Sequence, residues 1–370
     1  MYRNTWVEVN LDAIYDNVKK TKEICNKKYI AVVKANAYGN GDLQVAKTCL
    51  EAGADMLAVS SLDEAMILRN KGYDGDLFIL GATNPDDIDT MIQHHIATAA
   101  FSKEWINQIT SKKCNGLMVH LAIDTGMNRL GFKDKEECKH SLKQLLDAGC
   151  NVEGIFTHFY CSSEIDHIKT NKQFERFKEF VSYLGHPFKW IHCDNSDATI
   201  FFKDDISNAC RVGISLYGLS PFTNELKPSI SLYTEVFMTK TIHNGETVGY
   251  GALHTAKEDE IIGTCPIGYA DGFIRKNKGR KVYVDGMYAE VVGNVCMDQM
   301  MIRLPHDVPS GTKVEIFGEH IDIEDMANEL ETISYEIMCL ISERVTRRYI
   351  RHNKIQEESN LRLEHSELKK

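Results

Sequence analysis

The chain has 370 residues, more than the roughly 250–300 at which one hydrophobic core stops growing, so we expect two domains. Hydrophobic residues make up 43% and charged residues 26%, the balance of a globular protein rather than a disordered one. No apolar run reaches the roughly 20 residues that cross a bilayer, and no signal-peptide pattern is present. The net charge of −10 disfavours binding to nucleic acid. We therefore expect a cytoplasmic protein with a small-molecule ligand and no membrane or nucleic-acid partner.

Short apolar runs alternate with segments of helical periodicity over the first 220 residues. Stretches such as Asp42–Ala52, Leu62–Lys71 and Asn171–Leu184 repeat apolar residues every three or four positions, as amphipathic helices do. Eight strand-then-helix units predict an α/β fold of the TIM type, a (β/α)8 barrel. The candidate strands are Tyr29–Lys34, Met56–Ser60, Leu77–Leu80, Ala97–Phe101, Leu117–Asp124, Val152–His158, Trp190–Cys193 and Cys210–Ser215.

The pattern changes after Pro221, where alternating strands joined by NG, DG and similar turn pairs predict a mainly β domain. A helix is expected over Ile323–Leu330, followed by an apolar stretch at Ile333–Ser342 and by a charged tail, frayed or loosely helical, from Glu357. The predicted division is a barrel over 1–222, a mainly β domain over 223–356 and a tail over 357–370. Whether the first few residues pack with the second domain is left open.

Lys34 ends the first predicted strand, and reactive groups of such barrels lie at the carboxyl ends of strands. A lone lysine there is more often a surface residue, but Lys34 is followed by ANAYGNG, a loop that allows close approach to a ligand. A desolvated lysine forms Schiff bases with carbonyls, which is how pyridoxal phosphate (PLP) is attached.

The eleven cysteines are scattered without a CxxC pair, so we expect reduced thiols and no metal site.

The string AVVKANAYGNG resembles the PLP-lysine motif of the alanine racemase family. The resemblance extends along the chain through DTGMNRLGF, FTHF, HCDNSDA, RVGISLYG, VGYGALHTA, GYADG, CMDQ and SYEIMC, in family order. It implies a PLP-dependent isomerase with an amino-terminal barrel, a carboxy-terminal β domain and a head-to-tail homodimer with composite active sites. The implied activity is interconversion of L-alanine and D-alanine, which supplies D-alanine for peptidoglycan of the cell wall.

The resemblance also implies how the cofactor is bound. It places Arg211 against the pyridine nitrogen of PLP, and because an arginine does not readily give up a proton, that nitrogen stays unprotonated and transamination is suppressed. His158 and His192 are expected to orient Arg211, with Asn195 in a supporting position. The phosphate is expected to bind Tyr38, Ser196, the backbone N–H groups of Gly213 and Ile214, and Tyr335.

Racemisation is simplest with two proton-transferring groups on opposite faces of the substrate. Lys34 serves one face, and the resemblance assigns the other to Tyr250 of the partner subunit, assisted by the cationic surroundings of Arg211 and His158. Taken alone, a tyrosine between two glycines is more often a strand or turn residue.

The α-carboxylate of the substrate is assigned by resemblance to Arg129 and to the backbone of Met297. Asp298 and Tyr269 are placed at the site entrance, and Tyr335 is expected to narrow the pocket in favour of alanine. The chain departs from many relatives at Ala122, where they carry a carbamylated lysine that holds the substrate arginine. Asn128 and Asp194 also depart from common choices in the family.

Three alternatives stay open. A serine or broad-specificity amino-acid racemase would use the same residues, with Tyr335 as the discriminating feature. A PLP decarboxylase of similar architecture would have a different lysine context and lack the Tyr250 motif. A non-catalytic PLP carrier would lack the second domain.

Overall fold

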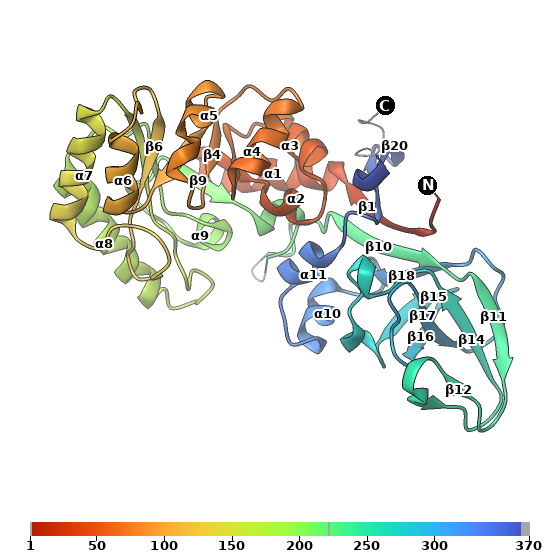
Figure 1. Cartoon of the computed structure of the whole chain (residues 1–370). Helices are drawn as coiled ribbons and strands as arrows, with labels where there is room; N and C mark the ends of the chain where they lie inside the picture. The colour runs from red at the N-terminus through yellow and green to blue at the C-terminus, as the bar shows by residue number, and fades with distance from the viewer. Residues whose placement is uncertain (1, 221–222, 364–370) are drawn as a thin grey trace. The chain divides into compact units, whose positions relative to one another are not determined.

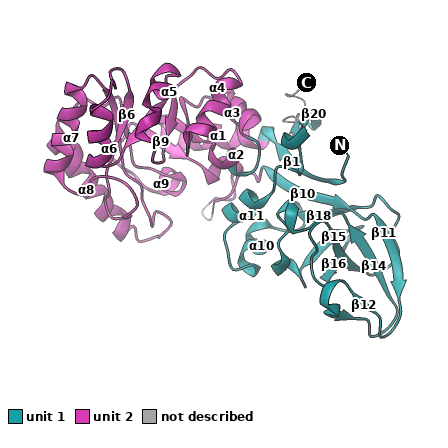
Figure 2. Ribbon diagram, viewed as in Figure 1, with its two compact units in different colours: residues 1–12, 38–41, 229–370 teal, residues 13–37, 42–228 magenta. Residues whose placement is uncertain are grey.

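The computed structural model describes residues 2–220 and 223–363 (Figure 1). The chain divides into two compact units (Figure 2). Unit 1 comprises residues 1–12, 38–41 and 229–370, and unit 2 comprises residues 13–37 and 42–228. Within the described residues, no helix has the length and apolar character needed to cross a bilayer.

Unit 2 contains a closed parallel barrel, which confirms the predicted fold class. Each of the eight candidate strands is present, and pairing of β2 with β9 closes the barrel within the described residues. Strands such as β3 and β9 are buried at every position, as expected where a parallel sheet is covered on both faces. The strands are β2 (Lys28–Val32), β3 (Met56–Val59), β4 (Leu77–Ile79), β5 (Ala97–Ala100), β6 (Met118–Ala122), β7 (Asn151–Phe156), β8 (Trp190–His192) and β9 (Ala209–Val212).

Several predicted strands were too long at their carboxyl ends. The clearest cases are the first, which ends at Val32 rather than Lys34, and the last, which ends at Val212 rather than Ser215. In both places the chain leaves the sheet to form a turn, so residues read as strand ends belong to loops at the barrel mouth.

Helices follow the barrel strands, and several begin at a side-chain cap. Ser61, Ser102 and Asp134 each accept a hydrogen bond from the backbone N–H three residues later. These caps satisfy N–H groups that lack a partner within the helix. The helices, with α1 following β1, are α1 (Leu11–Cys25), α3 (Asp42–Glu51), α4 (Leu62–Asn70), α5 (Ile88–Gln93), α6 (Lys103–Thr110), α7 (Lys135–Asp147), α8 (Ile168–Leu184) and α9 (Ser196–Phe201).

Unit 1 is mainly β, as predicted for the second domain. Its described strands form one ten-stranded sheet in the order β11-β14-β17-β16-β15-β18-β10-β1-β19-β20, with β12-β13 as a separate ribbon. β1, from the start of the chain, pairs antiparallel with β10 and parallel with β19. The strands are β1 (Thr5–Asn10), β10 (Ile230–Glu235), β11 (Met238–Ile242), β12 (Thr247–Val248), β13 (His254–Thr255), β14 (Glu260–Cys265), β15 (Lys281–Val284), β16 (Met287–Val292), β17 (Met300–Leu304), β18 (Lys313–Phe317), β19 (Thr346–Arg351) and β20 (Lys354–Ser359).

The two turn pairs that suggested hairpins behave differently. The DG pair, Asp285 and Gly286, joins β15 to β16 with both residues at positive φ, as a two-residue hairpin requires. The NG pair, Asn244 and Gly245, joins the consecutive strands β11 and β12, as predicted, but these two strands do not pair with each other as a hairpin. The chain after Gly245 turns into the β12-β13 ribbon, where Gly245 donates its N–H to the carbonyl of Ala256, while β11 pairs with β14.

The carboxy-terminal elements agree in part with prediction. Two helices, α10 (Ile323–Glu329) and α11 (Ser334–Leu340), occupy the predicted helix and the apolar stretch after it. The predicted start of the frayed tail was wrong, because residues up to Ser359 form β20 on β19. Residues 364–370 of that tail lie outside the described part of the chain.

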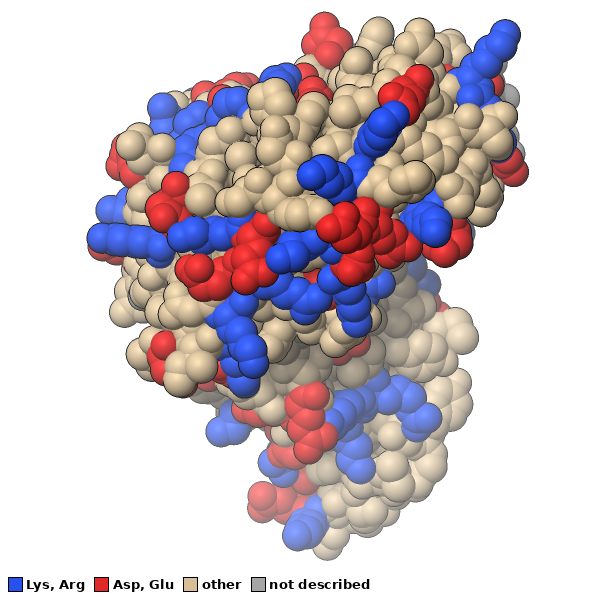
Figure 3. Space-filling view, turned by 90° about the vertical axis from the view of Figure 1, so that its left-hand side faces the viewer, with Lys and Arg blue, Asp and Glu red and all other residues tan. Residues whose placement is uncertain are grey.

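Acidic and basic side chains are mixed on the face shown in Figure 3. Blue and red groups alternate between tan areas rather than collecting by sign. A surface of this kind has no strong field of one sign to attract a polyanion toward that face.

Candidate active site

The segment after β2 adopts a rare backbone conformation. Ala35, Asn36 and Ala37 have φ of 51° to 54° and ψ of 47° to 51°, and Tyr38 has φ of 54°, so the turn from Lys34 (α2, Lys34–Tyr38) is left-handed. Such geometry costs roughly 1–2 kcal/mol per non-glycine residue and normally occurs at single positions. Strain of this kind persists where surrounding contacts impose it, and it is concentrated at functional sites.

Glu64, on α4, provides one of those contacts. Its Oε1 accepts the N–H of Ala35 at 2.7 Å, and its Oε2 accepts both the N–H and the hydroxyl of Ser60 at 2.7 and 2.9 Å. Asn36 Oδ1 also accepts the N–H of Asp42 at 3.0 Å. The half-buried Lys34 is therefore followed by a turn that is held at defined points.

We expect Glu64→Gln to destabilise the protein by about 1–3 kcal/mol, because the amide would present a donor where the backbone requires an acceptor. Urea unfolding followed by circular dichroism measures this change. Asp63→Asn, at the exposed preceding position of α4, is the matched control and should lie close to the parent protein. Equal stability of the two variants would contradict the structural role of Glu64.

Arg211, in β9, is buried and held by neutral groups. Its Nη1 donates to the ring Nδ1 and the carbonyl of His192 at 2.9 and 2.8 Å. Its Nη2 donates to the carbonyls of Thr157 and Cys193 at 2.7 and 3.2 Å, and lies 3.3 Å from His158 Nδ1. Among the described residues, no carboxylate forms an ion pair with this guanidinium. Arg211 is therefore fixed in position by neutral acceptors, and no neighbouring anion offsets its positive charge.

The histidines around Arg211 are kept neutral. Burial, together with the positive charges of Arg211 and Arg129, lowers the pKa of His158 to about 3. Burial and Arg211 also hold the pKa of His192 well below its ordinary value. Because Arg211 can only donate, His192 Nδ1 accepts, and its Nε2 is left to donate to His120 Nδ1 at 2.9 Å. Burial lowers the pKa of Arg211 to about 10, which leaves it charged at neutral pH.

Hydroxyl and backbone N–H donors gather where the chain leaves β8 and β9. Ser196 Oγ accepts the N–H of Gly213 at 2.9 Å and that of Ser215 at 3.4 Å, and Asn195 caps α9 through the N–H of Ala198. The Ser215 hydroxyl is buried and has no hydrogen-bond partner among the described residues. Ile214 begins the short 3-10 helix Ile214–Tyr217. Neutral donors arranged in this way suit a phosphate group.

Ala122 and Arg129 line a common small cavity. This cavity of about 30 Å³ also contacts Thr157 and His158. Within residues 2–220 and 223–363, Arg129 has neither a hydrogen bond nor an ion pair, so no described side chain holds its guanidinium in place. The cavity can hold a water molecule or a small ion near the guanidinium.

Tyr38 and Tyr335 lie together in unit 1, with ring centroids 5.9 Å apart. Gly39 has φ of +81°, and a Cβ there would lie 2.3 Å from the carbonyl oxygen of Met338 in α11, so only glycine fits. The buried Arg347 donates to the carbonyl of Gly39 at 3.1 Å. These contacts fix the Tyr38 segment on α11, and burial raises the pKa of Tyr38 above its ordinary value.

Met297, Asp298 and Tyr269 belong to a second rigid part of unit 1. The N–H groups of Tyr269 and Ala270 donate to the carbonyls of Cys296 and Met297, each at 3.0 Å. The buried Asp271 accepts the N–H of Gly268 at 2.8 Å. These bonds join the segment that carries Tyr269 to the segment that carries Met297.

Two arginines hold this part together. Arg3 forms a two-point ion pair with Asp271 and donates to the carbonyl of Asp298 at 2.9 Å. Arg344 lies 2.9 Å from Asp271 Oδ1 and 2.5 Å from Asp298 Oδ1. Arg3, Arg344 and Asp271 were not predicted from the sequence as site residues. Asp271 lies within the GYADG motif, whereas nothing local marks the two arginines.

Tyr250 lies at the edge of a pocket in unit 1. The tyrosine is 74% exposed, follows Gly249 at φ of +71°, and its carbonyl accepts from Asn294 Nδ2 at 2.7 Å. The pocket, of about 370 Å³, is also lined by Val248, Cys296 and Met301. Tyr250 is thus presented to the outside of its own unit on a defined backbone.

Two family models match most of the chain. Residues 9–221 match the family model "Alanine racemase, N-terminal domain", and residues 229–349 match "Alanine racemase, C-terminal domain". The chain belongs to the alanine racemase family. It is accordingly a PLP-dependent racemase, an isomerase.

Members of the alanine racemase family resemble this chain over almost its full length. The alanine racemase of Geobacillus kaustophilus is 44% identical over 97% of this chain and 98% of its own. A crystal structure of alanine racemase from Bacillus anthracis with bound L-Ala-P is 40% identical, with a TM-score of 0.94 over 98% of this chain and 99% of that one. A histidine racemase from Leuconostoc mesenteroides is 29% identical with a TM-score of 0.86, so one fold is found with different substrates.

The residues present fit the cofactor of the alanine racemase family. The unpartnered Ser215 hydroxyl and the Ser196 and Gly213 donors suit its phosphate, and Arg211 is a buried cation with no carboxylate bonded to it in the described structure.

Proposed function

We propose that this protein interconverts L-alanine and D-alanine with Lys34 and Tyr250 as the two proton-transferring residues. The observation that supports this most is the setting of Arg211 among carbonyls and neutral histidines. When bound, PLP withdraws electrons from the substrate's α-carbon and so makes its α-proton easier to remove. Arg211 cannot readily pass a proton to the pyridine nitrogen, which favours return of the proton over transamination.

Proton transfer and cofactor binding are assigned to different residues of the chain. Lys34 holds the cofactor and removes or returns the α-proton on one face, and Tyr250 does so on the other. Ser196 and the backbone of Gly213 and Ile214 bind the phosphate, a role that Tyr38 and Tyr335 share. His158, His192 and Asn195 keep Arg211 and this phosphate turn in place.

We assign substrate binding to residues that are exposed in their own unit. Arg129 binds the α-carboxylate through its planar fork, together with the backbone of Met297, while Asp298 and Tyr269 line the entrance. The lack of a partner for Arg129 among the described residues leaves its guanidinium available to a carboxylate.

We also propose a homodimer with composite sites. The 74% exposed Tyr250 is accompanied by exposed apolar residues, Leu253 at 55% and Met297 at 53%. Exposed apolar side chains that surround a functional residue are typical of a surface covered by a partner. A cytoplasmic location and a supply of D-alanine to peptidoglycan complete the proposal.

The test is to incubate the PLP-loaded protein separately with L-alanine and L-serine in deuterium oxide and to follow D-enantiomer formation and α-deuterium uptake. We expect alanine to react faster, because Tyr335 narrows the pocket. Tyr335→Ala should shift the kcat/KM ratio toward serine by about tenfold or more. Faster reaction of serine in the parent protein would favour the alternative, a serine or broad-specificity racemase. Absence of exchange with both substrates would reject the alanine assignment.

A further inference from the structure

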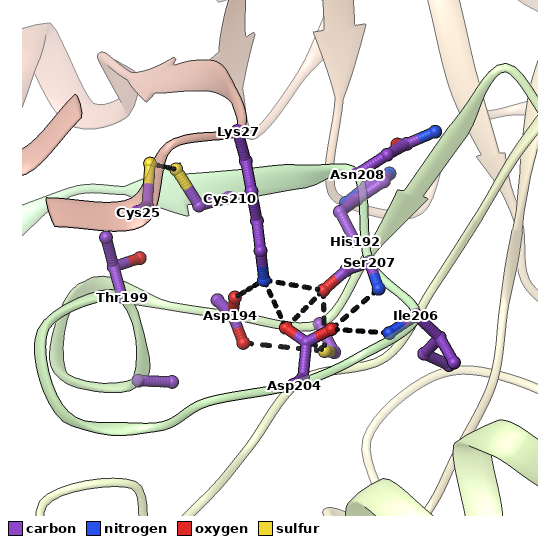
Figure 4. Close-up of polar contacts among 12 residues, drawn as sticks. Cys25, Lys27, His192, Asp194, Thr199, Asp204, Ile206, Ser207, Asn208 and Cys210 are labelled. Carbon is purple, nitrogen blue, oxygen red and sulfur yellow. Dashed lines mark hydrogen bonds and ion pairs between the residues drawn. The ribbon is translucent and has the colours of Figure 1, made fainter. Parts of the chain in front are cut away.

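Lys27, just before β2, contacts two buried carboxylates (Figure 4). Its Nζ lies 2.8 Å from Asp194 Oδ2 and 3.3 Å from Ser207 Oγ, and it forms an ion pair with Asp204. The side chains of Asp194 and Asp204 are only 2% and 0% exposed. This Lys27 cluster, consisting of Lys27, Asp194, Asp204 and Ser207, is not used in the mechanism proposed above.

The Lys27 cluster flanks the phosphate turn on both sides in sequence. Asp194 immediately precedes Asn195 and Ser196, and its carbonyl accepts the backbone N–H of Arg211 at 2.9 Å. After α9, Asp204 Oδ1 accepts the N–H groups of Ile206 and Ser207 at 3.0 and 2.6 Å. One ammonium therefore joins the segments before and after α9 to the start of β2.

The cluster depends on the charge of Lys27. Burial and the neighbouring carboxylate of Asp204 raise the pKa of Asp194 to about 7, while Lys27 acts in the opposite direction. Burial would lower the pKa of Lys27, but the two carboxylates raise it above the ordinary value. Without the lysine, ionisation of both aspartates would leave two like charges buried in contact.

Other titratable groups face the same space. The buried Cys193 thiol lies 3.5 Å from Asp194 Oδ1 and 3.8 Å from Asp204 Oδ2, and burial raises its pKa. Arg211 and Cys210 come from β9, and Cys25, at the end of α1, lies 3.2 Å from the Cys210 sulfur. Lys27 is the cation in direct contact with both carboxylates.

We propose that Lys27 is a positioning residue for the cofactor phosphate, because its ammonium contacts Asp194 and Asp204 together and thereby keeps the Asn195–Ser196 turn in place. This inference rests on the proposed function, which assigns the phosphate to Ser196. Its consequence is a defined pH dependence. In a protein without Lys27, the turn is kept only while Asp194 retains a proton to share with Asp204.

The direction of this pH dependence follows from the linkage between proton binding and folding stability. A carboxyl whose pKa is raised by folding loses stability as pH rises from its unfolded value to its folded value. Removing Lys27 raises the pKa of Asp194 further, so this loss continues above the parent value of about 7. The deficit of the variant relative to the parent therefore grows as pH rises through and above neutrality.

The experiment titrates apoprotein with PLP from about pH 6 to about pH 9 and compares Kd in Lys27→Met with the parent. We expect near-equal affinity at the low end and weakening by about tenfold or more at the high end. The double variant Lys27→Met with Asp194→Asn should restore a pH-independent ratio, because an asparagine amide donates to Asp204 without a charge. Lys27→Gln, which keeps a donor but no charge, serves if Lys27→Met does not fold.

Two controls separate the possible failures. Lys28→Met, which alters the neighbouring lysine that lies over Trp190, should leave PLP affinity unchanged. Ser196→Ala should weaken PLP binding at all pH values, and an unchanged affinity there would overturn the phosphate assignment itself. The role of Lys27 is overturned if Ser196→Ala weakens PLP binding while Lys27→Met does not. It is also overturned if the double variant binds PLP no more tightly than Lys27→Met at high pH. In both cases the proposed function stands.

Discussion

Replacing Lys34 by alanine is expected to reduce racemisation by about 10⁴-fold, because one residue is assigned both to cofactor attachment and to proton transfer. Initial rates measured from L-alanine and from D-alanine should fall together. Borohydride treatment of the parent protein, followed by peptide mapping, should place the reduced cofactor on Lys34, and no such peptide should form in Lys34→Ala.

The control for this prediction is Lys47→Ala, an exposed lysine on α3, which should keep both activity and the labelled peptide. A small primary amine added to Lys34→Ala should return part of the activity if the missing group is an amine base. Full activity of Lys34→Ala, or labelling at another lysine, would remove Lys34 from the site.

The structure gives a physical reason for so large an effect. Lys34 is followed by four non-glycine residues at positive φ, and that strain is balanced by the hydrogen bonds that Glu64 and Asn36 accept. A group held in this way loses little freedom when it reacts, which is how positioning lowers a barrier. A lysine supplied from another position would lack this support.

The sequence predicted the barrel because its strands are buried on both faces. Such strands appear as short continuous apolar runs, and runs like that of β3 are difficult to mistake when each is followed by a helical period. Periodicity does not show where the chain leaves the sheet. The left-handed turn was not predicted, because its positions 35–37 are Ala, Asn and Ala and none of them is the glycine that usually marks a positive φ.

Contacts between charged residues far apart in the chain could not be predicted from the sequence either. Lys27 lies 167 residues from Asp194 and 177 from Asp204, and Arg3 lies 268 residues from Asp271. Each partner alone has the pattern of an ordinary surface charge, and only folding makes it part of a buried pair. In contrast, the proposed site residues sit within contiguous motifs, where chemistry and spacing can be read together.

Replacing Tyr250 by phenylalanine is expected to slow racemisation by about 10²–10⁴-fold and, unlike loss of Lys34, to do so unequally for the two enantiomers. Lys34 would still exchange the α-hydrogen of one enantiomer with deuterium oxide, whereas exchange of the other would be lost with the phenol. Nuclear magnetic resonance of each pure enantiomer measures the two exchange rates separately.

Tyr288→Phe is the matched control, since Tyr288 is also an exposed tyrosine of unit 1, at 53%, and its hydroxyl donates to the carbonyl of His320. It should leave both exchange rates unchanged. Equal slowing of both enantiomers in Tyr250→Phe would indicate a general effect on the site and reject Tyr250 as a base. Exchange of one enantiomer without racemisation is the outcome that requires two groups on opposite faces, because a single residue serving both faces would lose both exchanges or neither.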